Sequence, residues 1–216
     1  DTLGWEHALK NAMRQAPDCI LIGEIRDKET MQAAIAYAQT GHLCLATLHA
    51  NNSYHALNRI INFFPLENRT ALYLDLSASL KAIISQRLVK RPNGQRLPTA
   101  EVLLNTRHIQ ELIERGEILA IKEAMEQSLA PGSQTFEQDL FRLYRDGIIT
   151  LDEALTNADS PTNLSWLINN SEIASPSSKD EKASEAAIEF SETSGNGTSF
   201  KEFTLSLDDV PEEEEN

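Results

Sequence analysis

Apolar residues recur at two different periods along the first hundred residues. Apolar positions three and four residues apart predict helices over about residues 5–13, 30–39, 53–64 and 67–84. Short continuous apolar runs predict two buried strands, at Cys19–Ile22 and Leu43–Leu48. A strand, a helix and a strand within about 30 residues form a βαβ unit, so the two strands should be parallel neighbours.

The second half of the chain changes to a hairpin signal followed by short helices. Turn residues at 90–94 separate apolar runs at 85–89 and 99–104, which predicts a β-hairpin at a sheet edge. Beyond Asn105, helix-start signals occur at Thr135, Thr150 and Ser160. Several short helices after an α/β unit predict a separate small helical domain.

The composition adds an acidic tail to this picture. The 216 residues, 41% of them hydrophobic, suffice for the core of one domain with a small appendage. The net charge of −14 argues against nucleic acid as a partner. Residues 171–216 hold 13 of the 33 acidic residues but 3 of the 19 basic ones. This segment also lacks periodicity, so we expect it to be disordered.

Cysteine usage and the start of the chain bear on its context. Cys19 and Cys44 lie in apolar runs, as free thiols do in a reducing cytosol, which disfavours a disulfide framework. The sequence contains neither a signal peptide nor an apolar run long enough to span a membrane. The chain begins with Asp1 and enters a helix almost at once. We therefore expect a fragment whose upstream part is missing.

Glu24 is the first candidate for chemistry. It follows the strand at Cys19–Ile22 directly after Gly23. Ligands of open parallel sheets lie outside the carboxyl ends of the strands, where a carboxylate can polarise water or reach a metal. The alternative is that Glu24, Arg26 and Asp27 form a solvated turn after a core strand.

Two histidines flank the second strand. A zinc pair is unfavourable, because six strand residues separate His42 from His49 and span about 20 Å. The parallel order puts His49 at the same sheet edge as Glu24 and His42 at the opposite edge. His49 is therefore expected to share a ligand site with Glu24, whereas His42 is expected to be structural or to lie at a subunit contact.

Three motifs resemble those of one family. The fifteen residues Met13–Asp27 resemble the signature of the secretion ATPase superfamily, in which this strand is the Walker B segment. Thr40–Asn51 resembles the His box of that superfamily, and Gln86–Leu88 resembles its Gln-Arg-Leu element. The resemblance covers roughly residues 5–170 and is strongest to the type IV pilus retraction ATPases PilT and especially PilU.

The resemblance implies an α/β fold with the C-terminal part of a RecA-like P-loop ATPase core. The implied division is this core over 1–104, a helical domain over 105–170 and the disordered acidic tail over 171–216. No Gly-x-x-x-x-Gly-Lys-Ser/Thr motif occurs, so the phosphate cradle is expected upstream of this chain. We therefore expect this chain alone to hydrolyse no ATP.

The implied cofactors are ATP and Mg²⁺, and the resemblance assigns roles to single residues. Glu24 would activate water or lie beside Mg²⁺, and His49 would sense the γ-phosphate. His42 belongs to the same box and is carried with it as a catalytic candidate. The cofactor-binding candidates are the charged residues Arg14, Arg26, Asp27 and Arg87. For Arg87, a plain surface role is the alternative to a phosphate or subunit contact.

The whole protein would be a hexameric motor of pilus retraction in the cytoplasm, peripheral to the inner membrane at the pilus base. Its implied partners are identical subunits, a related pilus motor ATPase and an inner-membrane platform protein. Gln110 and Glu114 replace two arginines of a retraction motif, which favours the PilU-like branch. Two alternatives stay open: a type II secretion or pilus-assembly ATPase, and a non-hydrolysing subunit that docks on a catalytic homologue.

Overall fold

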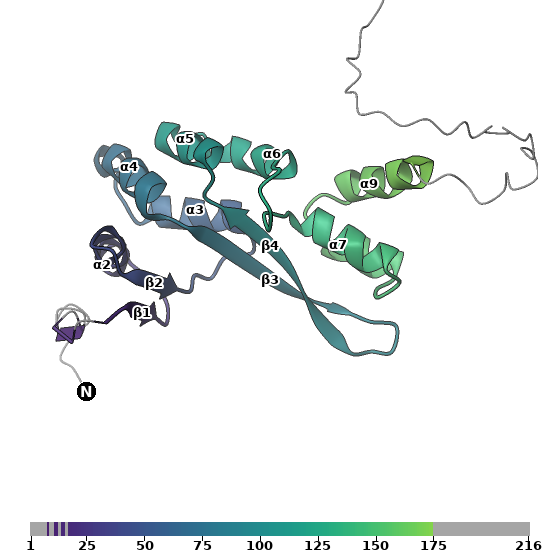
Figure 1. Cartoon of the computed structure of the whole chain (residues 1–216), viewed down its shortest axis with the longest axis horizontal. Helices are drawn as coiled ribbons and strands as arrows, with labels where there is room; N and C mark the ends of the chain where they lie inside the picture. Colours follow the sequence, from purple (N-terminus) through teal and green to yellow (C-terminus); the bar gives the residue numbers. More distant parts are fainter. Residues whose placement is uncertain (1–7, 9–10, 13, 16, 175–216) are drawn as a thin grey trace, which may run out of the picture. The chain divides into compact units, whose positions relative to one another are not determined.

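The computed structural model describes residues 8, 11, 12, 14, 15 and 17–174. The first strands in this part of the chain form a parallel βαβ unit (Figure 1). Strand β1 (Cys19–Ile22) pairs with β2 (Leu43–Ala46), and helix α2 (Lys28–Gln39) connects them. The register matches Cys19 with Leu43, so the predicted parallel pair is confirmed. Most of the helix expected over 5–13, like the tail beyond 174, lies outside the described residues.

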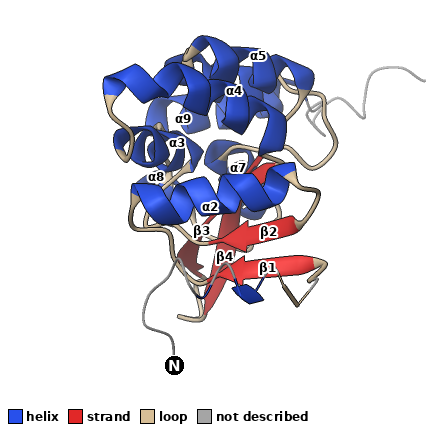
Figure 2. Ribbon diagram, turned by 90° about the vertical axis from the view of Figure 1, so that its left-hand side faces the viewer, coloured by secondary structure: helices blue, strands red, loops and turns tan. Residues whose placement is uncertain are grey.

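The ends of α2 follow from local chemistry. The side chain of Asp27 accepts a hydrogen bond from the Thr30 backbone at 2.8 Å and caps the first turn. Gly41 then takes a positive φ of 93°, which lets the chain reverse into β2. Helix α2 packs on one face of the two strands (Figure 2). Both strands were expected to be buried, but three of their leucines are exposed in the described part of the chain: Leu21, Leu43 and Leu45.

The next segment corrects one predicted boundary. Helix α3 (Ser53–Asn62) and a 3₁₀ turn (Leu66–Asn68) precede α4 (Arg69–Ser79). The helix expected to reach residue 84 ends at Ser79, because Leu80 is extended and Ile83 and Ile84 belong to a strand. The side-chain amide of Asn105 donates to the carbonyls of Ser77 and Leu80, which satisfies the end of α4.

That strand, β3 (Ala82–Lys90), pairs with β4 (Arg96–Leu104) in an antiparallel hairpin. The predicted hairpin is confirmed, although both strands are longer than the apolar runs suggested. It was expected at a sheet edge. Among the described strands it forms a two-stranded sheet of its own, separate from β1 and β2 (Figure 2).

Short helices make up the remainder of the described chain. They are α5 (Arg107–Arg115), a 3₁₀ turn (Ile118–Ala120), α6 (Ile121–Glu126), α7 (Phe136–Arg145), α8 (Leu151–Asn157) and α9 (Pro161–Ala174). Since α9 reaches Ala174, the first four residues of the expected tail are helical. No described helix is both long and apolar enough to cross a bilayer.

Two buried clusters stabilise this fold. The first joins β1, α2, α3 and α4 with α5 and α6, through residues such as Ile22, Leu57 and Ile113. The second joins Val89 of β3 with α7, α8 and α9. Among the helices, α2–α6 contribute to the first cluster and α7–α9 to the second, so the helices after residue 104 are shared between the two. The domain boundary expected at residue 104 stays a prediction.

One glycine lies at the contact between α4 and α5. Gly116 ends α5 in the left-handed conformation with a φ of 73°, and its N–H bonds back to Ile113. A Cβ atom placed there would lie 2.9 Å from the ring of Tyr73 on α4. The position therefore combines a backbone requirement with a close approach between two helices.

Candidate functional site

The ends of β1 and β2 bring Glu24 and His49 together. The Nε2 atom of His49 lies 2.7 Å from Oε1 of Glu24. The backbone pairing continues past the strands, since the N–H of Ile25 donates to the Thr47 carbonyl at 3.0 Å and the Thr47 hydroxyl donates to the Gly23 carbonyl. Because the strands are parallel, both side chains emerge at the same edge, as the sequence predicts.

Glu24 is held by an arginine and a histidine side chain. Its Oε2 accepts a hydrogen bond from Arg26 and forms an ion pair with it. That hydrogen bond is the main reason why the pKa of Glu24 lies below its ordinary value; burial opposes the shift, and the charges of Arg26, His49 and Arg59 add to it. The Glu24 side chain is 19% exposed, against 74% for Arg26 and 75% for His49. An ionised carboxylate thus lies beneath two exposed side chains that can rotate away.

Arg59 of α3 also belongs to this site, and the sequence analysis missed it. Its Nη1 donates to the His49 carbonyl at 3.1 Å, and its charge acts on Glu24. The Nε atom is buried and has no hydrogen-bond partner among the described residues. The available signal was weak: Arg59 lies on the polar side of a helix that has its apolar stripe elsewhere, ten residues after His49.

The other predicted site residues lie apart from this pair or have local partners. His42 precedes β2 at its opposite end, where its Nδ1 lies 2.9 Å from the Thr40 hydroxyl. Asp27 caps α2, and its pKa is lowered by hydrogen bonds from the Thr30 side chain and backbone. Arg14 is exposed, and its backbone N–H donates to the Asn11 carbonyl. Arg87 contacts the segment that follows His49 rather than Glu24.

Glu24 fits a limited role in cation binding. Within the described part of the chain, no group of three His, Cys, Asp or Glu side chains could hold a metal ion. Mg²⁺ in nucleotide sites commonly takes one or two carboxylates, with phosphate and water oxygens as its other ligands. A single carboxylate at a strand end is compatible with that pattern, provided that the nucleotide supplies most of the ligands.

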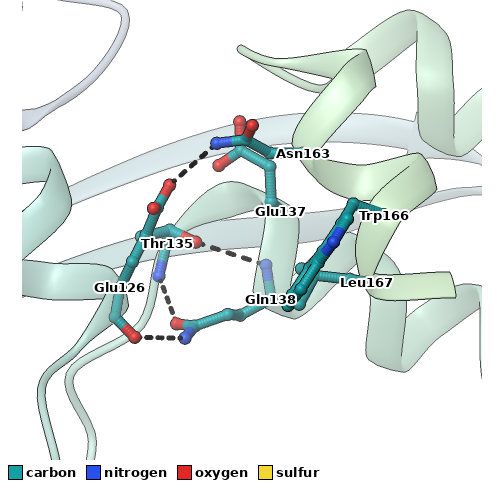
Figure 3. A pocket seen from close by; sticks show the side chains of 7 residues that line it. All are labelled: Glu126, Thr135, Glu137, Gln138, Asn163, Trp166 and Leu167. Carbon is teal, nitrogen blue, oxygen red and sulfur yellow. Dashed lines mark hydrogen bonds between the residues drawn. The ribbon is translucent and has the colours of Figure 1, made fainter. Parts of the chain in front are cut away.

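A pocket of about 280 Å³ lies elsewhere, among α6, α7 and α9 (Figure 3). Its polar groups bond to one another. Asn163 donates to Glu126, and Thr135 and Gln138 bond reciprocally as the capping box of α7. The ring of Trp166 and the side chain of Leu167 form another part of the lining. Because it contains neither Glu24 nor His49, this pocket is not part of the candidate site.

Comparison with known proteins identifies the class. The family described as "Type II/IV secretion system protein" matches residues 2–96. The mixed α/β structure also matches solved ATPases of this class, among them the pilus retraction motor PilT with bound ADP and DotB of Yersinia pseudotuberculosis. The chain therefore belongs to the family of type II/IV secretion and pilus ATPases.

Within the class, the chain is similar to pilus motors. It is 52% identical over 169 residues to the type IV pilus ATPase PilU of Pseudomonas aeruginosa, which covers 78% of this chain and 44% of PilU. It is 36% identical to the retraction ATPase PilT of the same organism, over 76% of this chain and 47% of PilT.

Two solved structures extend the comparison. The PilT structure with ADP has a TM-score of 0.69 at 36% identity and covers 77% of this chain and 47% of its own. DotB has a TM-score of 0.62 at 30% identity and covers 70% and 39%. The chain thus spans about half the length of the curated relatives it matches first.

Proposed function

We propose that this chain carries the Walker B and His box part of an ATP-hydrolysing motor subunit that powers type IV pilus retraction and twitching motility. The main support is that Glu24 and His49 meet at the carboxyl ends of two parallel strands, with Oε1 of Glu24 2.7 Å from Nε2 of His49. The similarity to PilU and PilT supports the biological setting. The complete protein would have a RecA-like core and act as a homo-hexamer with ATP and Mg²⁺.

Each side chain of the site has a distinct task in this proposal. Glu24 would accept the proton of the water that attacks the γ-phosphorus of ATP, with ADP as the leaving group, or would help to hold Mg²⁺. Before it can do so, Arg26 must move from the Glu24 carboxylate, where it now forms an ion pair. His49 would hydrogen-bond to a γ-phosphate oxygen, and Arg59 fixes the His49 backbone. Arg14, Arg26, Asp27 and Arg87 stay candidates for contacts to the nucleotide.

The remaining parts of the proposal concern assembly. The phosphate cradle would come from the half of the protein that this chain does not span. The working motor would lie in the cytoplasm, peripheral to the inner membrane at the pilus base. There it would contact a related pilus motor ATPase and the platform protein, and nucleic acid is not among its partners.

One observation favours a second candidate of another class. Gln110 and Glu114 stand where the retraction motif has arginines, and Gln110 is used locally, donating to the Asn105 carbonyl at 3.3 Å. A subunit that docks on a catalytic homologue, with little hydrolysis of its own, would tolerate these replacements. A type II secretion or pilus-assembly ATPase is the same-class alternative, in which the site chemistry is unchanged.

The test is ATP hydrolysis by the complete protein alone, compared with its His49→Ala and His42→Ala variants. We expect hydrolysis by the wild type, reduced turnover in intact hexamers for His49→Ala, and altered ring assembly for His42→Ala. Absence of hydrolysis by the wild type, with restoration upon adding a homologous motor, would favour the accessory subunit. Loss of turnover by His42→Ala within intact hexamers would contradict the site assignment.

A further inference from the structure

Arg87 joins four segments that are distant in sequence. Its Nη1 donates to the Asn157 carbonyl at 2.6 Å, at the end of α8. Its Nη2 forms an ion pair with Asp159 and donates to the Asn51 carbonyl at 3.3 Å. Its guanidinium lies 3.9 Å from the centre of the Phe136 ring on α7. An arginine from β3 thus bridges the segment after β2 to the helices of the second buried cluster.

Asp159 closes this arrangement from the other side. Its Oδ2 accepts a hydrogen bond from the Asn52 side chain at 2.7 Å. Burial alone would raise the pKa of Asp159, but the hydrogen bonds from Asn52 and Arg87, with the nearby positive charges, hold it below its ordinary value. Asn52 also caps α3 through its side-chain oxygen. We call Arg87, Asp159 and Asn52 the Arg87 clamp.

The clamp reaches the segment that carries His49. Residues 47–52 run from the end of β2 to the cap of α3 and have anchors along their length. Thr47 bonds to the end of β1, and Arg59 holds the His49 carbonyl. Asn51, two residues after His49, is held by Arg87. The contact between Arg87 and Asn51 differs from the others, because Arg87 also contacts α7 through the Phe136 ring and the end of α8 through the Asn157 carbonyl.

We propose that Arg87 is a positioning residue that couples His49 to helices α7–α9 through the Arg87 clamp. This inference rests on the proposed function. A shift of residues 47–52 upon nucleotide binding changes the contact of Asn51 with Arg87, and with it the arrangement of Asn157 and Asp159 after α8. By linkage the reverse also holds, so a load that displaces α8 and α9 alters the placement of His49.

The kinetic test uses the complete protein with Arg87→Lys, which keeps the charge but loses the two-pronged geometry. Asp159→Asn is a second variant that removes the opposite side of the clamp, and Arg96→Lys on the exposed part of the same hairpin is the matched control. We expect both clamp variants to lower kcat by about 10- to 100-fold, as small misplacements of catalytic groups do, with KM nearly unchanged. The control should match the wild type.

A double-mutant cycle with His49→Ala separates coupling from general destabilisation. If Arg87 acts through His49, Arg87→Lys should lower kcat far less in the His49→Ala background than in the wild type. Effects that simply multiply would overturn the proposal. So would an unchanged kcat in both clamp variants at temperatures where thermal unfolding shows them folded.

Hydrogen exchange gives a readout that is independent of turnover. Binding of a non-hydrolysable ATP analogue should change amide exchange in residues 151–158 of the wild type, and Arg87→Lys should abolish that change. A wild type that hydrolyses ATP but shows no such change would refute the coupling and leave the proposed function intact. A protein that shows the change but does not hydrolyse ATP would retain the coupling and refute the motor function.

Discussion

Two sets of carboxylates in this molecule have partners of different kinds. Glu24, at the sheet edge, is bound by Arg26 and His49, whose side chains are both about three-quarters exposed. Around α7, Glu101 and Glu137 are 3% and 1% exposed. Each of those two accepts a hydrogen bond from a backbone N–H at 2.7 Å, donated by Ser53 and Ser160 respectively.

This difference separates carboxylates available for chemistry from those that fix the fold. A backbone donor cannot leave without unfolding its segment, and an orphaned buried donor or acceptor costs about 1–3 kcal/mol. Exposed side chains can rotate away at little cost, because water replaces their hydrogen bonds. Glu24 can therefore exchange its partners for a nucleotide or a cation, whereas Glu101 and Glu137 cannot. Four predictions test this contrast.

The largest effect is expected at Glu24. Glu24→Gln keeps the size and hydrogen bonding of the side chain but removes the base, so turnover of the complete protein should fall about 10²- to 10⁴-fold. Nucleotide affinity and the free energy of unfolding should change little. Glu29→Gln, on the exposed face of α2, is the control in ATPase and denaturation assays. Near-normal turnover of Glu24→Gln would contradict the role given to the sheet edge.

The reverse pattern is expected at Glu137. Its Oε1 accepts from Lys122 at 2.9 Å and from the Ser160 N–H at 2.7 Å. Glu137→Ala leaves that N–H without its acceptor, so the free energy of unfolding should fall by about 1–3 kcal/mol. Turnover per folded molecule should fall far less than in Glu24→Gln. Urea denaturation measures the loss, with exposed Glu114→Ala on α5 as the control. Equal stability of the two variants would show that buried carboxylates do not fix this fold.

Asp27 lies next to the sheet edge, as Glu24 does, but it accepts a hydrogen bond from a backbone N–H, as Glu137 does. It therefore tests whether the position of a carboxylate or its hydrogen-bond donor decides its role. Asp27→Ala should lower the free energy of unfolding by about 1 kcal/mol through loss of the α2 cap. Asp27→Asn should preserve both the cap and turnover. If Asp27→Asn instead impairs turnover without loss of stability, the residue contacts the cofactor, as the family resemblance implies.

The smallest effects concern pH, and they have opposite signs. The lowered pKa of Asp159 contributes stability above pH about 4, which is lost as the pH falls through the folded-state value. Burial raises the pKa of Glu101, partly offset by hydrogen bonds from Ser53. Its contribution is present below pH about 4 and is lost as the pH rises through the folded-state value.

Urea denaturation between pH 3.5 and 7 distinguishes the two groups. The stability lost in Asp159→Asn should grow with pH up to a plateau. The stability lost in Glu101→Gln should shrink as the pH rises. If both variants changed in the same direction, the assignment of opposite pKa shifts to these two carboxylates would be wrong.

The sequence predicted the sheet edge because its determinants are local. Periodicity fixes β1, α2 and β2, and the parallel order of a βαβ unit then brings Glu24 and His49 to one edge. The end of α4 could not be found this way. Leu76, Leu80 and Ile83 continue a helical stripe, and the competing partner, Asn105, lies 25 residues beyond Leu80.

The same limit applies to the partners of Arg87 and to the buried clusters. Arg87 meets Asn157 across 70 residues of sequence, and no local pattern predicts such a contact. The apolar stripe of α5 indicates that Ile109 and Ile113 are buried, but it does not indicate that they pack in the cluster of β1 rather than with α7. Arg59 was overlooked because its contact with the His49 carbonyl depends on where α3 lies relative to the segment that follows β2.

Gly116 has a consequence for how this sequence can vary over evolution. Any other residue there would have to adopt a left-handed backbone and also displace the Tyr73 ring from α4. A smaller residue in place of Tyr73 would remove the steric conflict but not the need for a left-handed backbone at position 116. A substitution of Gly116 should therefore be rare, and it should be accompanied by a change at position 73. In an alignment of homologues, the glycine should be nearly invariant, and exceptions should coincide with a smaller side chain in place of the tyrosine. Such covariation would reveal the contact between α4 and α5 without any coordinates.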